Sequence, residues 1–244
     1  MTLQEKAFGF LTGLLKPAAP FDPTVFSDPF AQSTPWTPLV AGGSSFCTHR
    51  LKKIDNTALE FRPTFGLKLF CSVFVGMGAA FAFIPLGAIY RQFGGFHFSM
   101  LFSPLFGLFF CALGILMYYM ASAPILFDLK RRSYSKGWKS SVASSSGIKG
   151  VQVELDRVRG LQVLSEYCSG NKSSYYSYEL NLVLDDASRV NVVDHGDLKA
   201  LREDAQVLGQ SLEVPVWDME VAKSKPRESG NSSGPFPDSR MWQK

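Results

Sequence analysis

Residue types that can build a cysteine hydrolase occur in the C-terminal half of the chain. Cys168 would be the nucleophile and His195 its base, with Asp194 or Asp197 orienting the histidine. Cys168 falls in a polar loop predicted over 167–176, where no helix N-terminus lowers the pKa of a thiol. The other three residues lie where a predicted strand meets a predicted helix, and polar residues there usually cap free helix N–H groups. We therefore expect a capping role for them, rank catalysis last and predict that the chain is not an enzyme.

Metal and disulfide chemistry is not predicted either. The chain has four cysteines, without a Cys-x-x-Cys or His-Cys spacing that would indicate zinc. Cys47 and Cys168 fall on the predicted cytoplasmic side of a membrane, where disulfides are rare. Asp185 and Asp186 are best explained as turn residues, since no further carboxylates nearby would complete a calcium site. No catalytic residue, metal or cofactor is predicted.

Two long apolar stretches, 69–90 and 98–127, contain no Asp, Glu, Lys or Arg. A hydrocarbon core of about 30 Å needs about 20 apolar residues in a helix, so each stretch is long enough to cross a membrane. Small residues four apart, such as Gly76 with Ala80 and Gly78 with Ala82, favour close packing of the two helices in a hairpin. Because Tyr118 and Tyr119 would otherwise lie deep in the bilayer, the second helix is expected to end near Ser122, with a strand starting over 123–127.

Basic residues cluster beside both apolar stretches, and the connecting loop offers only Arg91. The positive-inside rule then predicts a multi-pass protein of the cell inner (plasma) membrane with both termini in the cytoplasm. The net charge of +4 and pI near 8.8 are explained by attraction to anionic lipid headgroups, and nucleic-acid binding is not predicted. The candidate lipid-headgroup contacts are Lys52, Lys53, Lys68, Lys130, Arg131 and Arg132.

The polar flanks are predicted to build one small domain that the helical hairpin interrupts. Alternating patterns predict strands within 45–62 and, after the hairpin, over 124–128, 133–138, 151–154, 160–166, 178–184 and 190–193. A helix is predicted over 197–212, with Leu198, Leu201, Ala205, Leu208 and Leu212 on one stripe and Lys199, Arg202, Glu203, Asp204 and Gln206 off it. We expect an α+β fold in which a two-helix membrane hairpin is inserted.

The domain boundaries follow from these patterns. Residues 1–43 form an N-terminal amphipathic helix and a Pro-rich arm; the helix, 2–16, either lies on the membrane or packs on the domain. Prolines between 17 and 38 predict an extended arm, and Trp36 is expected to pack it across the β domain. Residues 44–64 plus 123–218 form the split domain, 65–122 the transmembrane hairpin, and 219–244 a disordered tail.

The order of strands, membrane hairpin, more strands and a C-terminal helix resembles bacterial pleckstrin-homology-like domains attached to membrane helices. The chain also resembles a group of uncharacterised bacterial two-span inner-membrane proteins through PWTPL (35–39), Gly42 with Gly43, THRL (48–51), LEFRP (59–63), YELNLVL (178–184) and VNVVDHG (190–196). The resemblance implies a PH-like β-sandwich or barrel with a C-terminal helix, and a membrane location. It implies no catalytic residue, and the tail after Trp217 falls outside it.

The function expected is that of a membrane-anchored, non-enzymatic scaffold or regulatory module. Its cytoplasmic domain would bind a protein partner, a second copy of the chain or lipid headgroups. The alternative is an accessory subunit of a membrane transport or channel complex. Against this alternative, the two apolar stretches contain no ionisable residue of the kind that marks an ion path.

Overall fold

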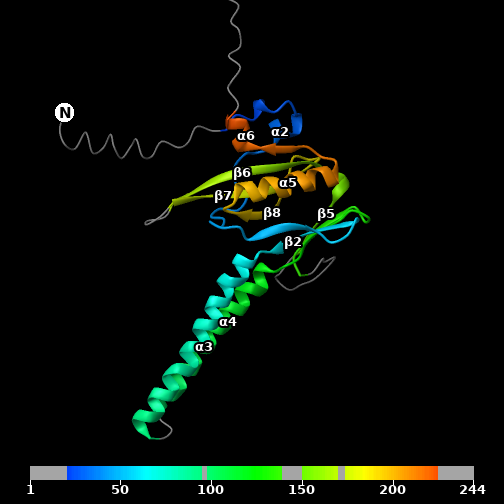
Figure 1. Cartoon of the computed structure of the whole chain (residues 1–244). Helices are drawn as coiled ribbons and strands as arrows, with labels where there is room; N and C mark the ends of the chain where they lie inside the picture. Colours follow the sequence, from blue (N-terminus) through cyan, green and yellow to red (C-terminus); the bar gives the residue numbers. More distant parts are fainter. Residues whose placement is uncertain (1–20, 95–97, 139–149, 170–173, 225–244) are drawn as a thin grey trace, which may run out of the picture.

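The computed structural model describes residues 21–94, 98–138, 150–169 and 174–224. The predicted amphipathic helix 2–16, the Ser-rich stretch 140–146 and residues 225–244 lie outside these ranges. Two β-sheets stack above a long pair of apolar helices, and short helices cover the far side of the second sheet (Figure 1). The fold is thus a small α+β domain carrying an apolar helical hairpin.

The sheet nearer the apolar helices has five strands, each antiparallel to its neighbour. In spatial order they are β1 (His49–Lys53), β2 (Ala58–Pro63), β3 (Ile125–Asp128), β4 (Ser133–Lys136) and β5 (Val151–Glu154). The second sheet has four strands in the order β8 (Arg189–His195), β7 (Ser174–Leu184), β6 (Val158–Ser169) and β9 (Val216–Asp218), with β6 and β9 parallel. The two sheets do not close into a barrel, so the structure bears out the two-sheet α+β arrangement and leaves the PH-like likeness a proposal.

The apolar hairpin leaves and re-enters the five-stranded sheet between neighbouring strands. Phe61 on β2 pairs with Ile125 on β3, although the whole hairpin separates them in sequence. The prediction that the N-terminal strands pair with strands after residue 123 is confirmed. The second apolar helix ends at Ala121 and β3 begins at Ile125, so the early end predicted near Ser122 is also confirmed.

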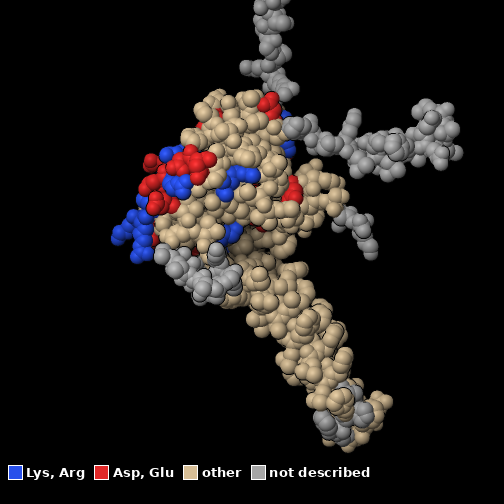
Figure 2. All heavy atoms as spheres, turned by 180° about the vertical axis from the view of Figure 1, so that it is seen from behind, with Lys and Arg blue, Asp and Glu red and all other residues tan. Residues whose placement is uncertain are grey.

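The apolar helices are α3 (Phe65–Phe93) and α4 (Phe102–Ala121), which follows the short η2 (Phe98–Leu101). Both are long and apolar enough to cross a membrane. They pack through the predicted pair Gly78 and Ala82, and a Cβ at Gly78 would lie 2.6 Å from the carbonyl oxygen of Gly107. The predicted pair Gly76 and Ala80 is a correction, because both residues are exposed and a Cβ at Gly76 would meet no atom of the described residues within 4 Å. Large side chains such as Phe83 and Phe102 point outward and are mostly exposed. On the face in Figure 2 the charged side chains lie on the β domain and none on the helices.

The core lies between the two sheets and α5 (Leu198–Leu212). Phe61, Phe127 and Tyr134 of the first sheet meet Leu180 and Leu182 of the second. From α5, Leu201, Ala205, Leu208 and Leu212 of the predicted stripe are buried in the same cluster, which confirms its core role. The position of Asp204 corrects the prediction. Helical periodicity puts Asp204 off the buried stripe, but its side chain is buried because α5 also lies beside the edge strand β1.

The outer face of the second sheet is covered by the N-terminal arm and the C-terminal end of the described chain. Trp36 packs there with Leu164, Val183 and Trp217, as expected for an arm crossing the domain. The expectation of a fully extended arm is wrong, because prolines at first-turn positions start η1 (Pro23–Val25) and α2 (Pro29–Ser33). The predicted start of the disordered tail is also too early: α6 (Met219–Ser224) is a helix, and buried Met219 anchors it.

Candidate functional site

Cys168 and His195 are held apart by the second sheet. The prediction of a loop over 167–176 is wrong at both ends. Cys168 lies on β6 opposite Tyr175, and β7 already begins at Ser174. His195 lies on β8 opposite Tyr178, so β7 separates the two residues. At about 4.8 Å between strands and about 3.3 Å per residue, the offset is about 10 Å in each direction. The cysteine hydrolase site is therefore not assembled.

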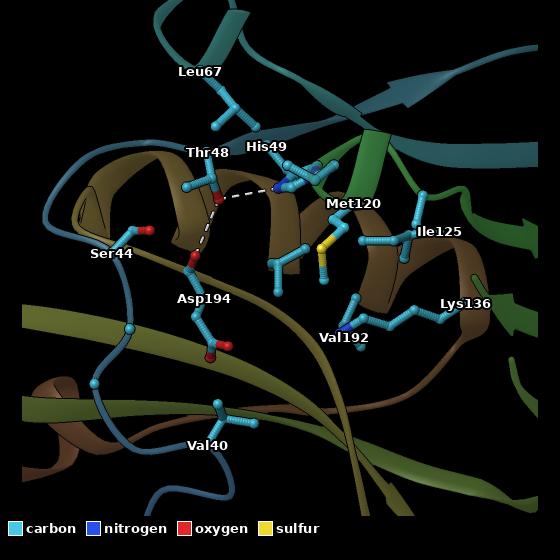
Figure 3. Close-up of a pocket in the computed structure, with 15 residues that line it drawn as sticks. Val40, Ser44, Thr48, His49, Leu67, Met120, Ile125, Lys136, Val192 and Asp194 are labelled. Atoms are coloured by element: carbon cyan, nitrogen blue, oxygen red, sulfur yellow. Dashed lines mark hydrogen bonds between the residues drawn. The ribbon is translucent and has the colours of Figure 1, made fainter. Parts of the chain in front are cut away.

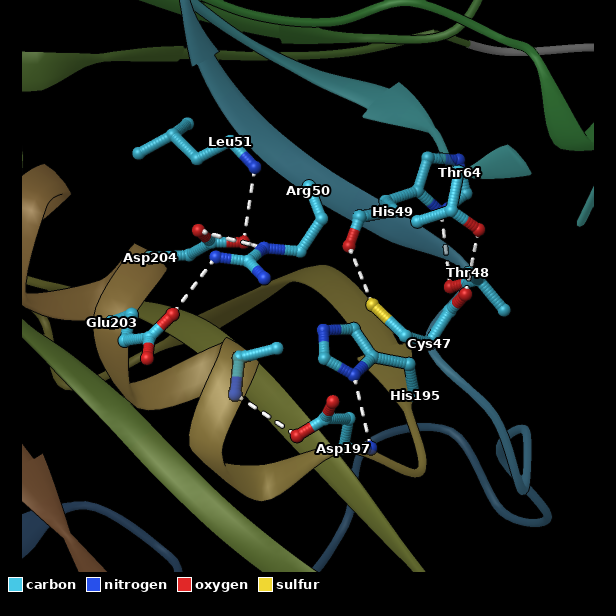
Figure 4. A network of polar contacts seen from close by, with 11 residues as sticks. Cys47, Thr48, His49, Arg50, Leu51, Thr64, His195, Asp197, Glu203 and Asp204 are labelled. Atoms are coloured by element: carbon cyan, nitrogen blue, oxygen red, sulfur yellow. Dashed lines mark hydrogen bonds and ion pairs between the residues drawn. The ribbon is translucent and has the colours of Figure 1, made fainter. Parts of the chain in front are cut away.

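His195 instead supports the start of α5 (Figure 4). Its Nδ1 accepts a hydrogen bond of 3.2 Å from the Asp197 backbone N–H, and Asp197 caps the helix through the N–H of Ala200. The imidazole is fully buried, and its Nε2 has no hydrogen-bond partner among the described residues. Burial lowers the pKa of His195 to about 4, so the ring is neutral at pH 7. The predicted capping role is confirmed for His195 and Asp197. Asp194 is a correction, since its carboxylate accepts from Asn191 and lines a cavity instead of capping α5.

Arg50 and Asp204 close the open edge of the five-stranded sheet. The Arg50 Nε lies 3.1 Å from Asp204 Oδ2, and the same carboxylate accepts a hydrogen bond of 3.0 Å from the Leu51 backbone N–H (Figure 4). Glu203 binds the other end of the guanidinium at 3.0 Å. An uncovered edge N–H would be a template for pairing with another chain. The helix α5 therefore covers β1 through a charged pair.

A basic groove of about 620 Å³ lies where β1 and β2 meet the start of α3. Three of the predicted headgroup contacts, Lys52, Lys53 and Lys68, line it together with Arg50 and Arg62. Arg50 and Arg62 are paired with carboxylates, whereas the ion pairs of the described residues include none of the three lysines. All three lysines are exposed. The groove thus presents uncompensated positive charge at the first turn of an apolar helix.

The other predicted contacts lie on the turn between β3 and β4. Lys130 is exposed and has no ion pair within the described ranges. Arg132 binds Asp156 at 2.8 Å, and Arg131 lies 3.8 Å from Asp128. These pairs partly neutralise the turn, so the lysines of the groove are the stronger candidate for anion binding.

A second concave site, of about 400 Å³, lies between the sheets, the arm and the helix ends (Figure 3). Leu67 of α3 and Met120 of α4 form its apolar side. Opposite them stand Val192, Val193 and Asp194, three consecutive residues of β8. A register shift in the β7–β8 pairing interrupts the usual alternation of side chains here. The bulge explains how neighbouring residues can line one cavity.

Two opposite charges face this cavity without meeting. The Lys136 Nζ donates to Asn191 Oδ1 at 2.8 Å, and Asn191 Nδ2 donates to Asp194 Oδ1 at 2.9 Å. No ion pair joins Lys136 to Asp194 within the described part of the chain. Burial lowers the pKa of Lys136, while burial and the Glu179 carboxylate raise the pKa of Asp194 to about 6. At pH 7 the Asp194 carboxyl is therefore mainly ionised.

His49 closes the cavity toward the apolar helices. Its Nε2 is 2.9 Å from the carbonyl oxygen of Ala121 at the end of α4, and its Nδ1 is 3.0 Å from the Thr48 hydroxyl. The Thr48 hydroxyl donates to the Asp194 carbonyl oxygen at 3.0 Å. Burial lowers the pKa of His49. His49 thus joins β1 to α4, a role that the sequence does not predict.

The charged residues of the cavity are not predicted as a site by the sequence. In the sequence, Lys136 is only one of several basic residues that follow the second apolar stretch. The available signal is its position two residues after Tyr134, because side chains two apart on a strand point to the same face and Tyr134 is a core aromatic. The described residues also contain no group of three or more His, Cys, Asp or Glu that could hold a metal ion.

Comparison with protein-family models, with curated proteins and with solved structures gives no match to this chain.

Proposed function

We propose that this chain is a membrane-anchored, non-enzymatic module whose β domain holds a basic groove against anionic lipid headgroups. In this proposal α3 and α4 cross the plasma membrane, both termini are cytoplasmic, and the domain is related to PH-like domains. The observation that carries the proposal is the location of Lys52, Lys53 and Lys68 in one groove at the first turn of an apolar helix.

The dimensions of the helices support a membrane location. At 1.5 Å per residue, the uncharged part of α3 between Lys68 and Arg91 spans about 33 Å, and α4 about 30 Å, close to the thickness of a hydrocarbon core. Tyr119 in the last turn of α4 stacks on Trp138 with ring centroids 4.8 Å apart. Tyrosine and tryptophan concentrate at membrane interfaces. The aromatic pair and the basic groove thus fall at the same end of the helices.

Lipid headgroups are the partner that fits the groove best. Lysines near an anionic membrane surface each contribute about 1 kcal/mol of attraction, and this falls off within about 10 Å at ordinary ionic strength. Lys68 follows Thr64, the residue that caps α3, so its ammonium group is held near the level at which the helix enters the bilayer. A helix anchored in the membrane supplies the proximity that such a short-range attraction needs.

The experiment is hydrogen exchange on the full chain in nanodiscs of phosphatidylcholine, with and without phosphatidylglycerol. The anionic lipid should slow backbone exchange over β1 and β2 several-fold. The effect should disappear in the double variant Lys52→Gln/Lys53→Gln and persist in Arg159→Gln/Lys199→Gln, which removes two exposed charges outside the groove. Equal slowing in all three proteins, or none in the wild type, would contradict the proposal.

A further inference from the structure

We propose that the cavity lined by Lys136 and Asp194 is a binding site for one membrane lipid with a zwitterionic phosphoethanolamine headgroup. The lipid phosphate would lie on the Lys136 ammonium and the lipid ammonium on the Asp194 carboxylate. The inference rests on the membrane location proposed above but not on the basic groove, which is a separate surface.

The separation of the two charges is the first argument. Asn191 bridges Lys136 and Asp194 through hydrogen bonds of 2.8 and 2.9 Å, so the ammonium and the carboxylate stay apart while facing the same space. A lysine ammonium has three donors, and within the described residues the hydrogen bonds of Lys136 go to Asn191 alone. Among the residues that the structure describes, the Asp194 carboxylate accepts one side-chain hydrogen bond, from Asn191. Each group therefore has capacity for one more partner of opposite charge.

The position of the cavity is the second argument. Its apolar wall includes Leu67 in the first turns of α3 and Met120 near the end of α4, at the level where the helices meet the domain (Figure 3). Met120 is 68% exposed, so this wall is continuous with the outward surface of α4. A lipid in the bilayer could thus place its headgroup in the cavity and keep its chains along the helix. The volume of about 400 Å³ is within the range of small-molecule sites.

The carboxylate selects the kind of headgroup. A primary ammonium donates a charge-assisted hydrogen bond to Asp194, whereas a trimethylammonium group has no N–H to donate. An anionic phosphoglycerol headgroup offers Lys136 a phosphate but gives Asp194 no cation. One charge-assisted hydrogen bond corresponds to about a tenfold or greater preference. Phosphoethanolamine lipids should therefore bind better than phosphocholine or phosphoglycerol lipids.

The test is native mass spectrometry of the full chain, released from mixed micelles containing equal amounts of the three lipids with identical acyl chains. The wild type should retain the phosphoethanolamine lipid about tenfold over the phosphocholine lipid. Asp194→Asn, whose amide oxygen can still accept from Asn191, should lose that preference but keep binding phosphate. Lys136→Met removes the ammonium group that would bind the phosphate, so this variant should retain none of the three lipids. Lipid retention without any preference in the wild type, or an unchanged preference in Asp194→Asn, would overturn the proposal.

Further variants separate binding from folding and from the groove. Ala123→Leu adds bulk to the cavity wall without changing a charge, so it should reduce retention even if Lys136→Met fails to fold. Lys52→Gln/Lys53→Gln should keep the wild-type preference, and a loss there would assign the lipid to the groove instead.

Water-soluble glycerophosphoethanolamine should not displace the lipid at equal concentration. Displacement would overturn the assignment to a membrane lipid.

Discussion

Glu179 and Asp194 lie directly opposite each other on β7 and β8, so two carboxylates share one face of the second sheet. Glu179 is buried and satisfies its charge locally: it accepts backbone N–H groups of Leu39 and Val40 from the arm, at 2.9 and 3.2 Å, and the Asn181 amide. Like charges opposite each other are unfavourable. The pKa of Asp194 is raised to about 6, first by burial and then by the Glu179 carboxylate.

Asp194→Asn should stabilise the domain above pH 6. The folded carboxyl has a pKa of about 6 and the unfolded one about 3.8, so between these values the folded state holds a proton that the unfolded chain has lost. Folding stability therefore falls as the pH rises from 3.8 to 6, and above pH 6 the ionised Asp194 carboxylate destabilises the folded state by up to about 3 kcal/mol. Asp194→Asn removes this destabilisation, so its free energy of unfolding should exceed that of the wild type at pH 8 and nearly equal it at pH 4. Urea unfolding of the detergent-solubilised chain would measure both. A gain independent of pH would refute the assignment to Asp194.

His195 should make the opposite contribution. Its folded pKa of about 4 lies below the ordinary 6.5, so on acidification the unfolded chain takes up a proton first and stability falls. Between pH 6.5 and 5 the loss is about 2 kcal/mol. His195→Asn keeps an acceptor for the Asp197 N–H and removes the titration. The unfolding free energy at pH 7 minus that at pH 5 should therefore be about 2 kcal/mol lower in this variant than in the wild type. The same value in both proteins would show that His195 is not the group responsible.

The stripe of α5 should carry much of the domain's stability. Leu201 and Leu208 are fully buried, so replacing either by Ala should cost about 2 to 5 kcal/mol of unfolding free energy. Lys199→Ala, on the exposed side, should change it by less than about 0.5 kcal/mol. Arg202 is not a neutral control, because its guanidinium binds Asp218 at 3.1 Å. Similar stabilities for Leu201→Ala and Lys199→Ala in urea titrations would exclude a core role.

Close packing of the apolar helices depends on Gly78. A Cβ there meets backbone atoms of Gly107 and Cys111, so Gly78→Ala must push the helices apart, at a cost of about 1 to 3 kcal/mol. A Cβ at Gly76 would meet no atom of the described residues within 4 Å, so Gly76→Ala is the matched control and should be neutral or slightly stabilising. Titration with dodecyl sulfate would measure both. Equal effects of the two substitutions would mean that the helices pack by another face.

Features of the fold that depend on residues close together in the sequence were predicted, and features that depend on residues far apart in the sequence were mostly missed. The stripe of α5 and the β7–β8 hairpin follow from periodicity within one segment. Pairing of the N-terminal strands with strands after residue 123 was predictable, because a hairpin of two helices returns the chain to the place where it left the sheet. The burial of Asp204 was not predictable, because it depends on Arg50, which is distant in the sequence. The cavity was missed for the same reason: Lys136 and Asp194 come from different sheets and meet only through Asn191.

The most direct test of the central claim is the depth of two nitroxide labels in lipid bilayers. The four native cysteines would be replaced, and single cysteines introduced at Phe83, an outward residue of α3, and at Lys53 in the groove. Collision with oxygen should dominate at position 83, and collision with a water-soluble nickel chelate at position 53. Anionic lipid should reduce chelate access at position 53. Equal chelate access at both positions would contradict a membrane-spanning α3 and, with it, the proposed function.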